Sequence, residues 1–328
     1  MILTNQELST VVFGACEKEQ SENGVKFFRM TQKQALAFTN HSADLTKKTS
    51  ATAGIFLDFY TDSDFFAFAY DNAEHGASRP WYYFELLIDG ESVALIGEEN
   101  AERKKGEFFK ELKKGVKRIT LVFPCLFSAR LVKVELSDGA TITPVKKKNK
   151  ILFFGDSITQ GYDSKCPSEN YVNRILLKTD SEGRNLAIGA ACFWADTIPD
   201  DYDFNPDFVF VAYGTNDWNY KTAFTEFKQD CTAYFEKLNR LYGEKPFFVI
   251  LPIWRSNYME NHPVGDYEKV RSTIAEISSS YKNVTVIDLW DTLPHELSLF
   301  TDGLHPNEKG FAVYAEAVLK ALRDRQTH

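Results

Sequence analysis

The periodicity of apolar residues changes near residue 148, and this change limits the fold more than any other feature of the sequence. Before it, apolar residues alternate with other residues in short runs, which is the pattern of half-buried strands. After it, short apolar runs alternate with segments of helical length. A chain of 328 residues is also long for one compact core. We therefore expect two domains, at residues 1–148 and 149–328, with the basic run 146–150 as a solvated linker.

The first of these domains is predicted to be a β-sandwich of the jelly-roll kind. Residues 55–59 and 66–70 carry apolar side chains at every second position. Apolar runs at 81–88 and 93–96 flank Asp89-Gly90, and this dipeptide favours a two-residue hairpin turn because both positions take a positive φ. Many short strands with little helical pattern between them are typical of a sandwich or jelly roll.

The second domain is predicted to be α/β, with a parallel sheet covered by helices on both faces. The predicted strands are 151–154, 186–188, 208–213, 247–251 and 284–289, and the predicted helices are 171–177, 222–241, 267–277 and 307–322. In such folds, functional residues gather at the carboxyl ends of the strands.

Composition argues against several classes of protein. A formal net charge of −8 disfavours a nucleic-acid partner, which would need clustered lysine and arginine. No apolar run is long enough to predict a membrane span, and the first residues lack the pattern of a signal peptide, so we expect a cytoplasmic protein. Neither a disulfide framework nor a metal site or cofactor is indicated by the scattered cysteines, which are Cys16, Cys125, Cys166, Cys192 and Cys231.

Polar residues that could take part in catalysis lie at three ends of the predicted strands and helices. Residues 154–159 (Phe-Gly-Asp-Ser-Ile-Thr) place Ser157 at a strand-to-helix turn, and residues 213–217 place Asn216 after a later strand. Just before the last helix, Asp302 and His305 are three residues apart, so the carboxylate can bind one ring nitrogen and leave the other for a serine hydroxyl. Each segment alone is more often a plain turn, but the three occur in order on one side of the predicted sheet.

This combination resembles the SGNH (GDSL-like) hydrolase superfamily over roughly residues 150–325. The first, third and fifth blocks of that superfamily are matched by residues 154–159, 214–217 and 302–306. The resemblance implies a three-layer α/β/α, flavodoxin-like fold and hydrolysis of acyl esters without a metal. The second block departs from the family's Asn-x-x-x-x-Gly pattern, because the counted position is Ala190 and the glycine, Gly189, comes one residue earlier.

The resemblance implies a Ser-His-Asp triad that forms an acyl-enzyme. Ser157 would be the nucleophile, His305 its general base and Asp302 the residue that orients the imidazole. The oxyanion would be bound by the Ser157 N–H, the N–H of Gly189 or Ala190, and the Asn216 side-chain amide. Three tryptophans after predicted strand ends could line the substrate pocket or belong to the core, namely Trp194, Trp218 and Trp254.

The order of the two predicted domains resembles that of the carbohydrate-esterase family 2 acetylesterases. This resemblance suggests hydrolysis of short acyl esters, acetyl above all, on sugars or oligosaccharides. Two alternatives stay open at this point. One is a lysophospholipase or thioesterase that acts on longer acyl chains, and the other is a catalytically inactive protein that binds carbohydrate through its β domain.

Overall fold

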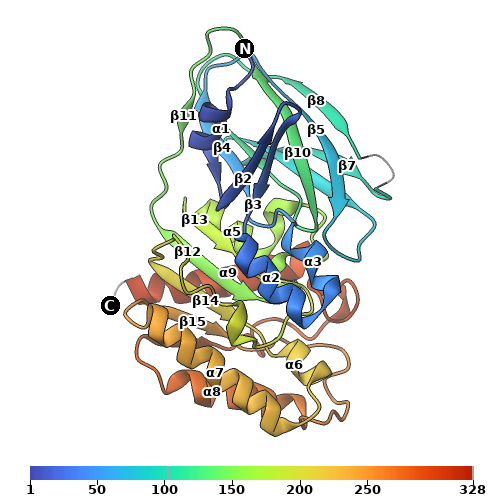
Figure 1. The fold of residues 1–328 in the computed structure, drawn as a ribbon, viewed down its shortest axis with the longest axis vertical. Coiled ribbons are helices and arrows are strands. Elements are labelled where there is room, and N and C mark those ends of the chain that lie inside the picture. Colours follow the sequence, from blue (N-terminus) through green and yellow to red (C-terminus); the bar gives the residue numbers. More distant parts are fainter. Residues whose placement is uncertain (102–103, 327–328) are drawn as a thin grey trace.

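The structure is a computed structural model that describes residues 1–101 and 104–326. Antiparallel sheets occupy one end of the molecule, and a parallel sheet with its helices occupies the other (Figure 1). The fold class predicted from the sequence is confirmed. The last strand of the antiparallel sheets ends at Pro144, and the first strand of the parallel sheet begins at Lys150. Among the described residues, no helix combines the length and apolar character that crossing a bilayer requires.

Two antiparallel sheets pack on each other to form the β-sandwich. The first has the order β1-β4-β9-β6-β7, with β11 added beside β4, and the second has the order β2-β3-β10-β5-β8. The strands are β1 (Val12–Phe13), β2 (Glu17–Ser21), β3 (Gly24–Phe28), β4 (Phe56–Thr61), β5 (Phe65–His75), β6 (Tyr82–Ile88), β7 (Glu91–Glu98), β8 (Gly106–Glu111), β9 (Lys117–Val122), β10 (Phe127–Leu136) and β11 (Thr143–Pro144), preceded by helix α1 (Asn5–Val11).

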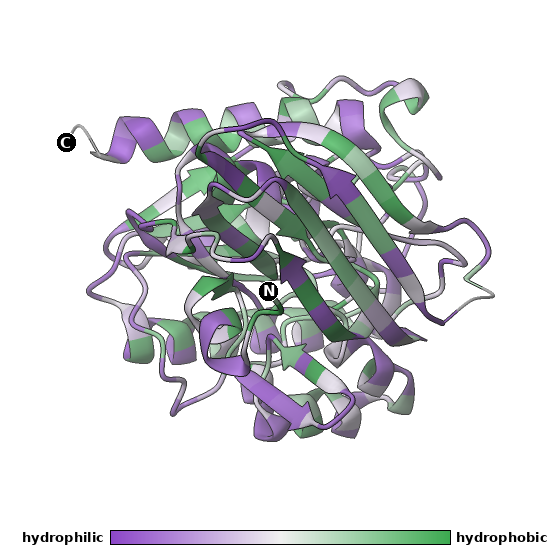
Figure 2. Ribbon diagram, turned by 90° about the horizontal axis from the view of Figure 1, so that it is seen from above, coloured by the Kyte–Doolittle hydropathy of each residue, from purple (hydrophilic) through white to green (hydrophobic). Residues whose placement is uncertain are grey.

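The predicted hairpin at Asp89-Gly90 is present between β6 and β7. Both turn residues have positive φ, 53° for Asp89 and 87° for Gly90, as a two-residue hairpin of this sequence requires. Apolar and polar residues alternate along the sandwich strands in Figure 2. The apolar side chains meet in one core between the two sheets, where Phe59, Phe68 and Phe84 are buried. Period-2 patterning therefore identified this half correctly.

Two helices interrupt the β half, and the period-2 reading did not predict them. Helices α2 (Gln32–His41) and α3 (Ala43–Thr49) follow β3, and they lie against the α/β half (Figure 1). Phe38 and Leu45 from these helices share a buried core with the α/β half. The segment thus belongs to the N-terminal half in sequence and to the core of the other half in packing.

The parallel sheet has the order β13-β12-β14-β15-β16, which is the doubly wound, flavodoxin-like arrangement. Its strands are β12 (Lys150–Gly155), β13 (Glu182–Asn185), β14 (Phe208–Ala212), β15 (Phe247–Ile250) and β16 (Val284–Ile287). The strand predicted at 186–188 is displaced, because the ladder with β12 uses residues 182–185. Residues 186–188 continue from its end as a buried, extended segment, in which the N–H groups of Leu186 and Ile188 donate to carbonyls of β12.

Helices cover both faces of this sheet, so its side chains alternate between two cores. Phe154 and Val211 face one core and Phe153 and Phe210 face the other. The first core includes α7 (Phe224–Tyr242) and α8 (Tyr267–Ser279), and the second includes α5 (Tyr171–Lys178) and α9 (Glu308–Gln326). The short helices are α4 (Ser157–Gln160), α6 (Thr215–Tyr220), η1 (Pro167–Glu169), η2 (Ala195–Thr197) and η3 (Leu297–Leu299).

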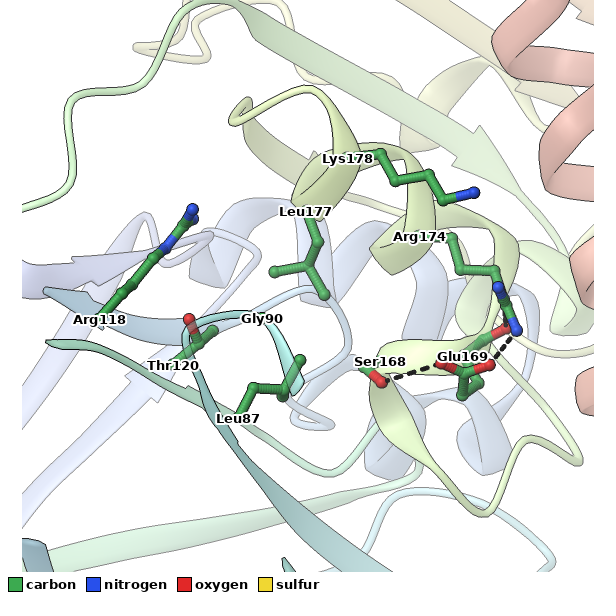
Figure 3. Close-up of a pocket in the computed structure, with 9 residues that line it drawn as sticks. All are labelled: Leu87, Gly90, Arg118, Thr120, Ser168, Glu169, Arg174, Leu177 and Lys178. Atoms are coloured by element: carbon green, nitrogen blue, oxygen red, sulfur yellow. Dashed lines mark hydrogen bonds and ion pairs between the residues drawn. The ribbon is translucent and has the colours of Figure 1, made fainter. Parts of the chain in front are cut away.

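The interface between the sandwich and α5 contains a pocket of about 220 Å³ (Figure 3). Arg118 reaches across this interface and binds Asp58 of β4 and Asp180 beyond α5, at 2.7 and 2.8 Å. Leu87 from β6 and Leu177 from α5 form apolar parts of the pocket wall. The lining residues do not include any predicted catalytic residue. We therefore assign this pocket to the interface between the two halves and not to the candidate active site.

Candidate active site

Ser157 is the first residue of helix α4, two residues beyond the end of strand β12. Asp156 caps this helix by accepting a hydrogen bond from the Ile158 N–H at 3.0 Å. Gly155 allows the tight turn, because a Cβ there would lie 2.3 Å from the Thr159 hydroxyl. The sequence after β12 therefore forces a short turn that presents Ser157 at the edge of the sheet.

Ser157, His305 and Asp302 form a continuous hydrogen-bonded chain. The Ser157 hydroxyl lies 2.8 Å from His305 Nε2, and His305 Nδ1 lies 2.8 Å from Asp302 Oδ2. Asp302 also accepts the backbone N–H groups of Leu304 and His305, at 3.0 and 2.8 Å. Partial burial raises the pKa of Asp302, but the hydrogen bonds from His305 and Leu304 outweigh it and hold the pKa well below its usual value. The carboxylate is therefore ionised and aligned with the imidazole.

A second carboxylate, which the sequence did not indicate, also faces His305. Asp163 Oδ2 lies 3.5 Å from His305 Nδ1, and its side chain is buried. Arg79, from the segment between β5 and β6, binds both oxygens of Asp163 at 2.5 and 2.7 Å and reaches Asp302 Oδ2 at 3.2 Å. The ring of Tyr162 stacks on His305 at a centroid distance of 5.4 Å. Asp163 and Arg79 thus lie beside the Nδ1 edge of the imidazole, and Tyr162 lies against its ring.

Asp163, Asp302 and His305 offer three atoms within 4.8 Å of one another, a spacing that could hold a cation. The guanidinium of Arg79 lies against both carboxylates, so a positive charge is already supplied by the protein.

On the other side of Ser157, the loop after β13 distinguishes Gly189 from Ala190. The Gly189 N–H donates to Gln160 Oε1 at 2.8 Å, and a Cβ at Gly189 would lie 2.8 Å from the Tyr162 ring. Ala190 has a φ of 72°, a conformation that normally favours glycine, and its N–H has no partner among the described residues. Glycine is needed at 189 for close packing, and Ala190 carries the free donor.

Asn216 lies on the same side of the site, in the first turn of α6. It is buried, and its amide nitrogen donates to the Ala191 carbonyl at 3.0 Å, which leaves the second amide hydrogen available. Asp217, the next residue, accepts the Phe193 N–H at 3.1 Å and so ties α6 to the same loop. Burial raises the pKa of Asp217 to about 7 and that of Asp156 to about 6.

Two cations from the N-terminal half bind the back of this loop. Arg29 Nη1 donates to the carbonyls of Asn185 and Ala187 at 2.6 and 2.7 Å, and Lys48 Nζ donates to that of Gly189 at 2.8 Å. The three carbonyls belong to every second residue, 185, 187 and 189, and so point to the same side of the chain. Both cations therefore bind one edge of this segment. Burial lowers the pKa of both side chains, that of Arg29 to about 10.

The three tryptophans proposed for the pocket occupy different environments. Trp218 has 0% exposure, its ring packs against His262, and its Nε1 donates to the Gly265 carbonyl, so it belongs to the core. Trp254 is buried beside Phe300. Trp194 is partly exposed and stacks on His41 of α2 at 4.1 Å. Of the three, Trp194 is the one that offers surface next to the loop of Ala190.

Comparison with known proteins agrees with this geometry. Residues 153–313 match the model of the GDSL-like Lipase/Acylhydrolase family. A search of curated proteins by sequence found no match. The solved structures with a similar fold include the salicylyl-acyltransferase SsfX3 from a tetracycline biosynthetic pathway, with a TM-score of 0.80 and 19% identity over 95% of this chain and 94% of that one.

Two carbohydrate esterases are also similar in fold. A family two carbohydrate esterase from Clostridium thermocellum, in complex with cellohexaose, has a TM-score of 0.69 and 13% identity over 96% of this chain and 99% of that one. The acetyl xylan esterase Est2A from the rumen bacterium Butyrivibrio proteoclasticus has a TM-score of 0.63 and 14% identity, covering 84% and 90% of the two chains. At these identities the likeness establishes a shared fold. Together with the family match, it confirms the resemblance found in the sequence, and residues 153–313 form a carboxylic ester hydrolase domain of the GDSL-like lipase/acylhydrolase family.

Proposed function

We propose that this protein is a serine esterase that hydrolyses short acyl esters, acetyl esters above all, on carbohydrates. The observation that carries the proposal is the chain of contacts from the Ser157 hydroxyl through His305 to Asp302, with both distances at 2.8 Å. A serine that shares a hydrogen bond with an imidazole, itself held by a carboxylate, is equipped for nucleophilic acyl transfer.

In the proposed reaction, His305 Nε2 accepts the proton of Ser157 as its Oγ attacks the ester carbonyl. Asp302 keeps the other ring proton on Nδ1 and stabilises the imidazolium that forms. The imidazolium then gives its proton to the leaving alcohol, and the acyl group stays on Ser157. Water attacks this acyl-enzyme with His305 again as base, which releases the acid and restores the serine.

The tetrahedral oxyanion would be held by three donors. These are the Ser157 N–H at the start of α4, the Ala190 N–H and the Asn216 amide. We assign the loop donor to Ala190 because the Gly189 N–H is already bound to Gln160. The positive φ of Ala190 is the kind of backbone strain that persists where surrounding structure fixes it, as the contacts of this loop do here.

Two observations support a small acyl group and a sugar. The partly exposed ring of Trp194 could stack on a sugar face near the oxyanion loop. The fold is also shared with an acetyl xylan esterase and with a carbohydrate esterase in complex with cellohexaose.

The first test is hydrolysis of p-nitrophenyl acetate, butyrate and octanoate by the wild type and by Ser157→Ala. We expect the highest kcat/KM on acetate and its loss in the variant, and the next substrates are acetylated xylo- and manno-oligosaccharides. A preference for octanoate would favour the longer-chain lipase or thioesterase. No turnover dependent on Ser157 with any of these esters would overturn the proposal and favour a protein that only binds carbohydrate.

A further inference from the structure

The acid side of the site contains more charge than one triad needs. His305 Nδ1 faces Asp302 at 2.8 Å and Asp163 at 3.5 Å. The shorter contact is a hydrogen bond, and the longer one is a close electrostatic contact. Asp302 is partly exposed to solvent, whereas Asp163 is buried. Since a buried charge is screened less by water, the more distant carboxylate still acts strongly on the ring.

Backbone conformation supports a specific role for Asp163. Its φ is 66°, in the left-handed region, where aspartate is tolerated better than most residues. It follows the left-handed Gly161, which ends α4, so the chain turns sharply after the nucleophile helix. Such a conformation has a cost that surrounding contacts must offset, and the two hydrogen bonds from Arg79 are contacts of this kind.

Arg79 balances the charge of this group. With a neutral imidazole, two carboxylates and one guanidinium sum to −1, and the imidazolium formed during attack brings the sum to zero. Without Arg79 the corresponding sums would be −2 and −1, which would favour the charged ring even before substrate binds. In the part of the chain that the structure describes, the other titratable groups near His305 are the stacked phenol of Tyr162 and the buried carboxyl of Asp156.

We propose that Asp163, aligned by Arg79 from the β half, is a second acidic partner of His305 that shares the orienting role of Asp302. The proposal rests on the proposed serine mechanism and deepens it. Asp163 and Arg79 are positioning residues, because they act through the imidazole. Arg79 lies 84 residues from Asp163 and 223 from Asp302 in sequence, so the β half completes the acid side of the site.

The first experiment is a double-mutant cycle with Asp302→Ala and Asp163→Asn, measured as kcat on p-nitrophenyl acetate. Asparagine suits the left-handed conformation at 163, and alanine at 302 does not impose a wrong tautomer on the ring. If the carboxylates share the role, each single variant retains much of the activity. The double variant then falls by about 10³–10⁴, the loss typical of a missing triad acid and more than the product of the single losses.

A role for Asp163 in anchoring alone predicts a different result. Asp163→Asn would then reduce kcat by the same factor in both backgrounds, or Asp302→Ala alone would be as inactive as the double variant. Either outcome overturns the proposal. The proposed esterase function is tested separately, by whether Ser157→Ala abolishes the wild-type turnover. Failure of the Asp163 proposal can therefore be distinguished from failure of the proposed function.

The second experiment follows the acid limb of the kcat/KM profile against pH, which reports the ring's loss of its proton. Asp163→Asn removes an anion and should move this limb to lower pH by about 1 unit, whereas Arg79→Gln removes a cation and should move it to higher pH by a similar amount. Arg79→Lys keeps the charge but not the paired hydrogen bonds to Asp163. The acid limb should therefore return to its wild-type pH, while kcat stays below the wild-type value. The matched control is Arg240→Gln, at an exposed surface pair. Limbs that coincide in all variants would refute the electrostatic part of the proposal.

Discussion

Arg29→Met should both destabilise the protein and impair catalysis, because this side chain joins the two halves. Its guanidinium is completely buried and donates to four backbone carbonyls, of Ala51, Asn185, Ala187 and Lys48, at 2.6–3.0 Å. No carboxylate pairs with it among the residues that the structure describes. Its pKa of about 10 still leaves it charged at neutral pH. The substitution therefore removes a buried cation together with all four of these bonds.

The expected cost follows from these contacts. Net contributions of about 1.5–3 kcal/mol for each hydrogen bond to a charged group sum to roughly 6–12 kcal/mol. Relief of several kcal/mol of desolvation offsets part of this, since burying an unpaired cation is itself costly. A loss of about 3–5 kcal/mol remains. For 328 residues unfolding together, the entropy at the midpoint is about 0.7 kcal/mol per degree, so Tm should fall by roughly 4–7 °C.

Calorimetry and steady-state kinetics on p-nitrophenyl acetate would measure the two effects of Arg29→Met. We expect kcat to fall by about ten- to a hundredfold, because the freed segment 185–187 leads into the loop of Ala190 and small displacements of catalytic groups are costly. Arg240→Met is the control, since its side chain is 66% exposed and such surface pairs contribute about 0–1 kcal/mol. A Tm within 2 °C of wild type, with unchanged kcat, would refute this account of Arg29.

Three further predictions concern the nucleophile side. Asn216→Ala should lower kcat on p-nitrophenyl acetate by about 10²–10³ with little change in KM, as loss of an oxyanion donor does, and a change confined to KM would contradict that role. Gly189→Ala should lower both Tm and kcat because its Cβ would lie 2.8 Å from the Tyr162 ring, and wild-type values for both would contradict the close packing. Asp217 has a folded pKa of about 7, above its unfolded value, so the folded state binds more protons and stability falls as pH rises from about 4 to 7. Asp217→Asn should thus raise Tm at pH 8 relative to wild type and have little benefit at pH 4, and the reverse order would show that the carboxylate is stabilising.

The contacts among Ser157, His305 and Asp302 could be anticipated from the sequence because each of these residues is encoded locally. Ser157 and Asn216 follow apolar strands directly, and Asp302 and His305 lie within one turn, so periodicity places all of them at one edge of the sheet. Short-range patterns of this kind depend on few neighbours. The choice between Gly189 and Ala190 depends instead on which N–H is already bonded, and that is decided by Gln160 in another loop.

The contributions from the N-terminal half could not be predicted in the same way. Arg79, Arg29 and Lys48 have partners 84 to 223 residues away, and nothing in their own segments distinguishes them from surface cations. Helix α2 was missed because only Gln34 and Phe38 are buried along it, which gives a weak helical stripe. Its Thr31 cap, which accepts the Gln34 N–H, was the local feature that could have revealed it. Tryptophan positions after strands likewise did not separate the buried Trp218 from the partly exposed Trp194.

The distribution of charge connects the packing of the two halves to the proposed chemistry. Attack on an ester creates negative charge at the carbonyl oxygen and positive charge on His305. The β half places Arg29 and Lys48 behind the loop of Ala190, where their positive charge favours the negative charge on the carbonyl oxygen. It also places Arg79 against the carboxylates that favour the positive charge on His305. These cations hold backbone carbonyls and carboxylates in fixed positions before substrate arrives, so little reorganisation is needed during attack. The sandwich therefore contributes to the proposed chemistry through electrostatic preorganisation, whether or not it also binds sugar.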